Sequence, residues 1–441
     1  MDLKNISFQP VSDIKLIQEH KLKKMLSYLQ HFSPFYKKFF EANCVRIDEL
    51  NSIADLVKIP TISKNDMQQA NWDFLCVPKQ KVVDYCCTSG TLGNPVTIAL
   101  TENDLERLAL NEYGSFVCAE GKSDDVYQLQ LTLDRQFMAG IAYYSGLRKL
   151  GAGIIRIGTG NPIMQWENIK KYNPTTLVGV PSLLLQLKEY VLELKTDINT
   201  CSVKKLICIG ENIRRADFSL NTLGMKIQTG WNVQLFSTYA SSEMQTAFTE
   251  CRAGSGGHLQ PELIIVEILD DQGEPLSDGE IGEVTITTLD VEGMPLLRYR
   301  TGDLCFKQTE PCVCGRNTMR LSPVLGRKQH MIKLKGTTMY PPALLDLLNG
   351  IEEIKEYYVE VSSNEYGLDE VLIFIQPSST GTELIQKIQS VLQARLRVTP
   401  NIRIVSSNEI QSLQIQDGSR KAHFFRDKRV KNSNSSDQPT F

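Results

Sequence analysis

The segment YCCTSGTLGNPV, residues 85–96, decides the fold, because it packs small hydroxylated residues and glycines into one short stretch. Thr88, Ser89 and Thr91 can offer hydroxyl donors, while Gly90 and Gly93 lack the side chains that would keep backbone N–H groups away from phosphate oxygens. This pattern is typical of a phosphate-binding loop and predicts the use of a nucleotide. The alternative is an ordinary turn after a strand, since a glycine-rich turn alone occurs in many folds.

Four further segments follow this loop in a fixed order. They are FSTYASSE ending at Glu243, LLRYRTGDL with Asp303, LGRKQHMIKLKG with Arg327, and SRKAHFFRDKR with Lys421. Together with TSGTLGNP they resemble the signature segments of the adenylate-forming enzymes, the acyl-CoA synthetase and ligase superfamily. Within that superfamily the chain is most similar to phenylacetate-CoA ligases, and the similarity extends over roughly residues 20–430.

The fold class expected from these features is α/β. A chain of 441 residues is too long to fold around one ordinary hydrophobic core, so we expect more than one domain. From 126 to 236, short apolar runs alternate with helical segments, which predicts a parallel sheet with helices on its faces. We expect a large AMP-binding domain at 1–326, with a β-rich subdomain at about 260–325, and a small mobile α+β domain at 327–430. The final residues, 431–441, show no apolar periodicity and are predicted to be a disordered tail.

Composition places the chain among ordinary globular proteins. Hydrophobic residues make up 41% and charged residues 22%, with a formal net charge of -3, so nothing suggests nucleic acid as a partner. The N-terminus lacks the pattern of a signal peptide, and no run approaches 18 apolar residues, so we expect a soluble cytoplasmic protein without a membrane partner. The eleven cysteines should then be reduced, and Cys118 and Cys208 are expected to be buried as small hydrophobic side chains.

Residues 13–42 carry apolar side chains at helical spacing and predict a helical N-terminal cap. Ser63 and Thr101 each precede a charged, helix-like stretch and are predicted N-caps. The side chains of the N-terminal cap that should pack in the core are Ile14, Leu16, Ile17, Leu22, Met25, Leu26, Leu29, Phe32, Phe35, Tyr36, Phe39 and Phe40.

Two pairs of potential metal ligands lie about 50 residues apart. Cys251 and His258 belong to ECRAGSGGH, and Cys312 and Cys314 belong to EPCVCGR. The four could be unrelated, because C-x-C is common and C-x6-H is not a standard zinc-finger spacing. Comparable segments recur in some members of the phenylacetate-CoA ligase group, and this resemblance implies a structural Zn²⁺ site. A shell of three cysteines and one histidine would be closed to substrate and would staple loops together.

The resemblance also implies a two-step reaction. A carboxylic acid first reacts with ATP to give an acyl-adenylate and pyrophosphate, and coenzyme A then takes the acyl group and releases AMP. The loop from Thr88 to Gly93 would hold the β- and γ-phosphates, and Glu243 would hold Mg²⁺. Asp303 would accept both ribose hydroxyls and Arg327 would contact ribose or phosphate, while Lys421 would bridge the carboxylate and the α-phosphate.

The remaining site residues follow from the same resemblance. Gly210, Glu211 and Tyr239 match positions that frame adenine, and Ser242 is expected at the same nucleotide site. Phe137, Tyr143 and Ala240 are candidates for the pocket of the acid, although such aromatics are often simply core residues. We expect an aryl or arylacetic acid. The expected partners are therefore this acid, ATP and CoA, and the resemblance is compatible with a homodimer.

The chain departs from the family pattern at several positions. The loop usually reads TSGTTGKP, so Leu92 and Asn94 replace a threonine and a lysine, which should weaken ATP binding rather than abolish it. Ala240 stands where glycine is common and should narrow the acid pocket. Gln329 and His330 replace two aspartates at the hinge, and the histidine suggests that rotation of the small domain depends on pH. The glycine that commonly precedes the catalytic lysine is also absent, although Gly418 lies close to Lys421.

Two other classes of function stay open at this point. An adenylyltransferase or acyl-adenylate synthetase could pass its product to a carrier-protein thiol or to the hydroxyl of a cofactor, because similarity of fold does not fix the acceptor. A non-catalytic homologue could retain the fold alone. The joint presence of Glu243, Asp303, Arg327 and Lys421 argues against this last class.

Overall fold

The computed structural model describes residues 6–88, 96–334, 337–364, 368–378, 382–396, 398, 400–414 and 423–429. The chain forms two compact units, Met1–Val324 and Leu325–Phe441, so the boundary falls two residues before the one expected from the sequence. The serines, threonines and glycines of the loop after Thr88, the catalytic candidate Lys421 and the tail lie outside the described residues. Within the described part, no helix has the length and apolar character needed to cross a membrane.

A mixed sheet of nine strands is the centre of the first unit, in the order β13-β14-β9-β8-β7-β6-β5-β3-β4. The strands from β4 to β7 are parallel, and those from β7 to β13 are antiparallel. Thus β13 and β14, which lie inside the range 260–325, join this large sheet. The strands are β3 (Val126–Leu129), β4 (Gly153–Arg156), β5 (Thr176–Gly179), β6 (Lys205–Ile209), β7 (Gln234–Ser241), β8 (Thr246–Glu250), β9 (Gly257–His258), β13 (Lys307–Gln308) and β14 (Arg320–Leu321).

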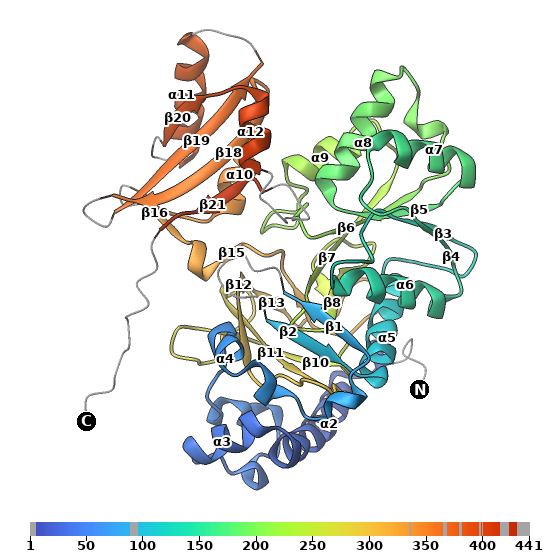
Figure 1. Ribbon diagram of the computed structural model, residues 1–441, viewed down its shortest axis with the longest axis vertical. Helices are drawn as coiled ribbons and strands as arrows, with labels where there is room; N and C mark the ends of the chain where they lie inside the picture. The colour runs from blue at the N-terminus through green and yellow to red at the C-terminus, as the bar shows by residue number, and fades with distance from the viewer. Residues whose placement is uncertain are drawn as a thin grey trace. The chain divides into compact units, whose positions relative to one another are not determined.

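Helices cover both faces of the parallel strands, as the alternation of apolar runs and helical segments predicts (Figure 1). Successive strand residues point to opposite faces, so on β5 Leu177 and Val178 enter different cores. Leu177 packs with α7 (Pro162–Tyr172) and α8 (Pro181–Glu193), near α9 (Thr222–Gln228). Val178 packs with α5 (Glu102–Cys118) and α6 (Met138–Leu150). The predicted β–α–β part is therefore confirmed.

The N-terminal cap consists of α2 (Val11–Phe32) and α3 (Pro34–Ala42). Ser33 separates them, since its side chain accepts a hydrogen bond from the Tyr36 backbone and Pro34 fits the first turn of α3. The prediction that Leu16 and Phe32 are core residues is wrong: they are 64% and 57% exposed. Leu16 follows the buried Ile14 by two positions, which places it about 200° around the helix and away from the core.

Short helices and a hairpin connect this cap to the rest of the first unit. The N-caps predicted at Ser63 and Thr101 are confirmed, and each of them forms a capping box, at the starts of α4 (Lys64–Gln69) and α5. The remaining elements here are η1 (Ile47–Glu49), η2 (Ile53–Lys58), η3 (Asn71–Phe74), η4 (Lys79–Lys81) and the antiparallel pair β1 (Asp84–Cys87) and β2 (Thr97–Leu100), whereas η5 (Ile198–Thr200) lies between α8 and β6.

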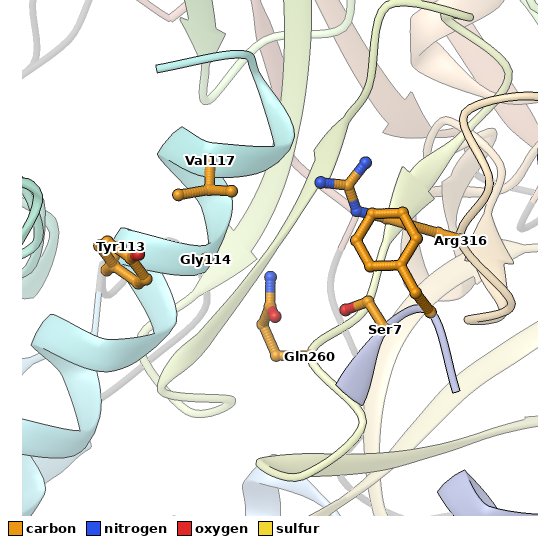
Figure 2. Close-up of a pocket in the computed structure, with 7 residues that line it drawn as sticks. Ser7, Tyr113, Gly114, Val117, Gln260 and Arg316 are labelled. Carbon is orange, nitrogen blue, oxygen red and sulfur yellow. The ribbon is translucent and has the colours of Figure 1, made fainter. Parts of the chain in front are cut away.

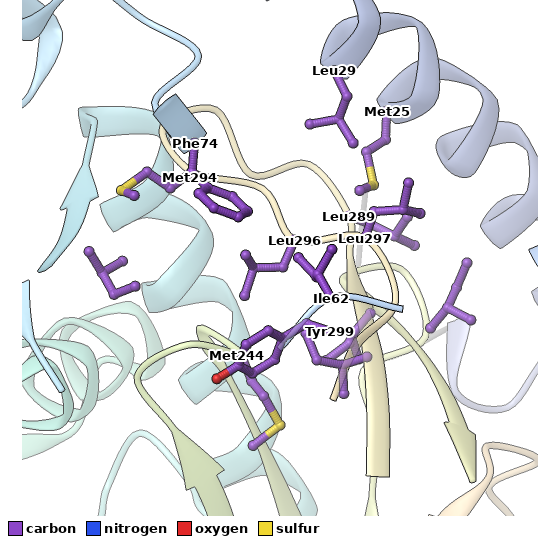
Figure 3. Close-up of a cluster of buried hydrophobic side chains, with 14 of the residues drawn as sticks. Met25, Leu29, Ile62, Phe74, Met244, Leu289, Met294, Leu296, Leu297 and Tyr299 are labelled. Carbon is purple, nitrogen blue, oxygen red and sulfur yellow. The ribbon is translucent and has the colours of Figure 1, made fainter. Parts of the chain in front are cut away.

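A second sheet in this unit contains β10 (Ile264–Leu269), β11 (Gly282–Thr288) and β12 (Tyr299–Cys305), paired antiparallel. Its apolar face and the segment before β12 share one core with α2, η3 and the turn after β7. Figure 3 shows Met25, Leu29 and Phe74 directed toward Leu296, with Met244 next to Tyr299. This core fixes two predicted parts of the site, because Met244 follows Glu243 and Tyr299 begins the strand that carries Asp303.

The second unit is a small α+β fold built on a sheet with the order β20-β19-β18-β21. The buried residues of α10 and α11, such as Leu344 and Ile388, pack with the apolar side chains of β18 and β19. The elements are β15 (Gly326–Arg327), η6 (Lys328–His330), β16 (Ile332–Leu334), β17 (Thr337–Met339), α10 (Pro341–Asn349), β18 (Ile354–Ser363), β19 (Asp369–Pro377), α11 (Thr382–Leu396), β20 (Asn401–Ile404), α12 (Ser407–Gln414) and β21 (Phe425–Asp427).

Candidate functional site

The predicted adenine-framing residues lie at the carboxyl ends of two neighbouring parallel strands, β6 and β7. The register pairs Ile209 with Thr238, so the next residues, Gly210 and Tyr239, lie side by side. Gly210 has φ of +74°, a left-handed conformation that glycine adopts without strain. In open α/β sheets, ligands collect at this edge.

Glu211 has a clear structural role beside any contact with a nucleotide. Its carboxylate accepts hydrogen bonds from the backbone N–H and the hydroxyl of Ser182, both at 2.9 Å. Ser182 lies in the first turn of α8, where backbone N–H groups have no partner within the helix and a negative charge is favourable. Glu211 therefore ties the loop after β6 to the start of α8.

Tyr239 and Asp303 are brought together although they are 64 residues apart. The Tyr239 hydroxyl donates a hydrogen bond of 2.8 Å to Oδ2 of Asp303. Burial and the nearby Asp303 charge raise the pKa of Tyr239 well above its usual value, so the phenol stays protonated as a donor. The Tyr239 ring also stacks on Phe248, with ring centroids 5.8 Å apart. The stacked and buried Tyr239 therefore orients the Asp303 carboxylate through this hydrogen bond.

Glu243 lies in the turn between β7 and β8, and its side chain is only 10% exposed. Its Oε1 is 3.4 Å from Nζ of Lys64, at the start of α4. Ala240 is exposed near the end of β7, and Ser242 is half-buried in the turn. The only signal for Lys64 in the sequence is the predicted N-cap at Ser63, the residue before it.

Thr88 is the one described member of the predicted loop residues. It is buried, and its hydroxyl oxygen accepts a hydrogen bond of 3.1 Å from the Val96 backbone, while its own N–H donates to the Val96 carbonyl. Thr88 and Val96 thus close the neck of the loop and extend the β1–β2 pair. Arg327 belongs to the second unit, where its side chain is exposed.

The residues predicted to bind the acid are placed differently from one another. Phe137 is half-buried at the start of α6, whereas Tyr143 is buried between helices and contacts Phe116 edge-on, with centroids 5.8 Å apart. Both belong to the core formed by α5, α6 and the sheet. The acid pocket therefore stays a prediction.

Next to Tyr143, the packing of α5 on α6 buries a carboxyl group that the sequence did not single out. A Cβ on Gly146 would lie 2.4 Å from Cβ of Glu112, so the helices approach closely at this point. Burial raises the pKa of Glu112 from 4.5 to about 8, because the charged form loses its hydration. Asn111 donates a hydrogen bond to one oxygen at 3.0 Å.

We expect this group to make stability fall as pH rises. Between pH 4.5 and about 8 the folded state holds a proton on Glu112 that the unfolded state has lost, so the free energy of unfolding decreases with pH in this window. The Glu112→Gln variant, which stays neutral, should lose several degrees less in melting temperature from pH 5 to 8. Glu106→Gln, an exposed position on the same helix, is the matched control. An equal change of melting temperature from pH 5 to 8 in the wild type and in Glu112→Gln would contradict a raised pKa of Glu112.

The two predicted ligand pairs come together beside β8 and β9, in the antiparallel part of the nine-stranded sheet. Ligand atoms of Cys251, His258, Cys312 and Cys314 all lie within 4.8 Å of one another. The two sulfurs of Cys251 and Cys312 are 3.7 Å apart, and Cys314 Sγ is 3.6 Å from His258 Nε2. A tetrahedral zinc with Zn–S bonds of about 2.3 Å needs sulfurs about 3.8 Å apart, so the donor set fits this ion.

The surroundings of the cluster also suit a metal centre. His258 Nδ1 is 2.8 Å from Thr318 Oγ1, a partner that leaves Nε2 free to face the other ligands. Arg316 donates to Cys314 Sγ at 3.5 Å, and a guanidinium here would offset the excess negative charge of three thiolates. Cys118, expected to be an ordinary buried residue, is indeed buried but packs against the same thiols.

Arg316 extends this centre toward the N-terminal segment. Its guanidinium lies 5.0 Å from the centre of the Phe8 ring, and Asn317 N–H donates to the Ser7 carbonyl at 2.8 Å. Figure 2 shows Arg316 and Ser7 across a small cavity from Gly114 on α5, with Gln260 between them. The loop that carries Cys312 and Cys314 therefore contacts and orders the first described residues of the chain.

The fold, with Gly210 and Tyr239 at the ends of its parallel strands, agrees with the class of AMP-binding enzymes. The sequence profile of that family matches residues 46–291, more than half of the chain, and the protein belongs to this family. A phenylacetate-coenzyme A ligase of Thermus thermophilus is 28% identical over 378 residues, which are 84% of this chain and 82% of the relative. A phenylacetate-coenzyme A ligase of Escherichia coli is 26% identical over 407 residues, 89% of this chain and 90% of the relative.

Solved structures show the same fold. The crystal structure of 2-hydroxyisobutyryl-CoA ligase, in the postadenylation state in complex with R3-HIB-AMP, superposes with a TM-score of 0.83. The two chains are 20% identical, and the match covers 96% of this chain and 91% of that one. The adenylate-forming α/β fold expected from the sequence is confirmed.

Proposed function

We propose that the protein is an AMP-forming acid–CoA ligase that acts on an aryl or arylacetic acid. The observation that carries this proposal is the hydrogen bond between Tyr239 and Asp303, which joins β7 to β12, with Glu243 in the turn that follows β7. Membership of the AMP-binding enzyme family and the similarity to two phenylacetate-coenzyme A ligases support it. The names of these relatives, which are phenylacetate-coenzyme A ligases, support the choice of an arylacetic acid.

In the first half-reaction, a carboxylate oxygen of the acid attacks the α-phosphorus of ATP. The bond between the α-phosphorus and the bridging oxygen breaks, and pyrophosphate leaves. Asp303 would accept the ribose hydroxyls while Tyr239 holds its carboxylate in place. Lys421 would stabilise the charge that develops between the carboxylate and the α-phosphate. Glu243, a buried carboxylate, fits as the ligand of Mg²⁺, which when bound supplies charge neutralisation for the phosphates.

In the second half-reaction, the sulfur of coenzyme A attacks the acyl carbon of the adenylate. The acyl–oxygen bond breaks, AMP leaves, and the thiol proton passes to solvent. Movement of the small domain between the two half-reactions would let the same bound intermediate meet two different sets of residues.

The acceptor can be tested directly by following AMP release. Enzyme, ATP and a reactive acid are mixed with free CoA, with a carrier protein bearing phosphopantetheine, or with neither thiol. We expect rapid AMP release and an acyl-CoA product, identified by mass, only with CoA. Acylation of the carrier alone would replace the proposal by an acyl-adenylate synthetase, and transfer of AMP itself would indicate an adenylyltransferase.

We also propose that Cys251, His258, Cys312 and Cys314 hold a structural Zn²⁺. The protein as isolated should contain about one zinc per chain, and chelation should lower its melting temperature, because the metal joins segments about 60 residues apart. Amide exchange in a peptide that covers residues 6–17 should also rise, since Arg316 and Asn317 hold that segment. Cys314→Ala should lose the metal, whereas Cys208→Ala, a buried thiol on β6, should keep it. Metal-free protein of unchanged stability would refute the site.

A further inference from the structure

We propose that Lys64 is a phosphate-binding residue of the nucleotide site, a role that rests on the proposed function. In the structure its ammonium group faces Glu243, the predicted Mg²⁺ ligand, at 3.4 Å. The Lys64 side chain is 34% exposed and that of Glu243 is 10% exposed, so the pair is partly removed from water but can still be reached by a ligand. A cation in this position suits the charge of a triphosphate.

The segment before Lys64 is fastened to the strand that carries Asp303. The backbone N–H of Ile62 donates to the Arg298 carbonyl at 3.1 Å, and Arg300 N–H donates to the Ile62 carbonyl at 2.8 Å. Asp303 follows three residues later on β12. The capping box of Ser63 and Asp66 then fixes the first turn of α4, where Lys64 begins the helix.

The segment after α4 is fastened to the strand that leaves the predicted phosphate loop. The Asn71 amide donates to the Thr97 carbonyl at 2.8 Å and accepts from Thr97 N–H at 2.9 Å. Thr97 is next to Val96, which closes the neck of the loop with Thr88. Since α4 has only six residues, about 9 Å in length, Lys64 is held between the ribose-binding strand and the base of the loop.

The charges explain what Lys64 would do there. The loop has asparagine at position 94, where the family usually has lysine, so the loop itself contributes no side-chain cation. Without a nucleotide, the buried carboxylate of Glu243 needs a positive partner, and Lys64 is that partner. With a magnesium nucleotide bound, Glu243 would bind Mg²⁺. The ammonium group of Lys64 could then form charge-assisted hydrogen bonds with phosphate oxygens.

Binding of α,β-methylene-ATP, which cannot transfer its adenylyl group to the acid, tests this role without turnover. The analogue is titrated into the protein in the presence of Mg²⁺, and its binding is measured by calorimetry. Its affinity for Lys64→Met should be about tenfold or more weaker than for the wild type, because a charged hydrogen bond is lost. Lys64→Arg should retain most of the affinity. Lys58→Ala is the matched control, since Lys58 forms an exposed ion pair with Asp55 at 2.6 Å.

The outcomes separate this role from a structural one and from the proposed function. A structural ion pair predicts a lower melting temperature of nucleotide-free Lys64→Met with unchanged affinity for the analogue, and that result would overturn the proposal. Failure of the wild type to bind the analogue would instead count against the proposed function. If Lys64→Met does not fold, Lys64→Gln carries the same test, and equal affinity of this variant and the wild type would again reject the role.

Discussion

Lys421→Ala is expected to lose acid-dependent ATP–pyrophosphate exchange by a factor of about 10²–10³ or more, because it removes the positive charge that we propose stabilises the transition state. Thioester formation from supplied acyl-adenylate should remain nearly unchanged, since that step does not involve the α-phosphoryl transfer. The two rates are measured separately, by exchange of labelled pyrophosphate and by the appearance of acyl-CoA.

The same basic stretch provides the control for this variant. Lys428 forms an ion pair of 2.6 Å with Glu360 in the small unit, so Lys428→Ala removes a charge that is already engaged. It should leave both half-reactions close to the wild type. Equal loss of both half-reactions in Lys421→Ala would show that this lysine has no specific role in adenylation.

Asp303→Ala is expected to raise the KM for ATP by about two orders of magnitude, because the variant loses the buried carboxylate that we propose accepts the two ribose hydroxyls. Tyr239→Phe should have a smaller effect, about five- to tenfold, since it removes only the 2.8 Å hydrogen bond that orients the carboxylate. Initial rates at varied ATP concentration measure both effects.

2′-Deoxy-ATP provides a control for the ribose contact. With this substrate one hydroxyl is already missing, so Asp303→Ala should cost less than it does with ATP. An identical loss with both nucleotides would indicate that Asp303 acts through the packing of β12 and not through the ribose. A melting temperature close to that of the wild type would confirm that the variant folds.

The sequence predicts the main architecture well because its local patterns agree with the packing. The alternating apolar runs and helices from 126 to 236 become β3 to β7 with α6 to α9, and Thr101 caps α5 as expected. The predictions are wrong where a local pattern does not show which way a side chain points. Leu16 and Phe32 have the right composition for a core, yet the helix turns them outward. The short β14 pairs with β9, and β13 pairs with β14, which no local pattern could reveal.

For the site, motif order locates Tyr239, Glu243 and Asp303, and the structure brings Tyr239 to Asp303 and Cys251 to Cys312. Other residues depend on contacts that only the fold creates. Lys64 is one lysine among many in the sequence. Its ammonium group lies 3.4 Å from Glu243 because hydrogen bonds on both sides of α4 hold this helix in place. Glu112 looks like a surface residue of a polar helix until α6 packs over it.

The most direct test of the central claim is acid-dependent ATP–pyrophosphate exchange across arylacetic, benzoic, cinnamic and fatty acids. The measurement reports adenylate formation alone and does not require the acceptor to be known. We predict exchange that depends on an aryl or arylacetic acid, in the absence of CoA. Exchange with none of these acids, by folded protein that binds ATP, would contradict the proposed ligase activity.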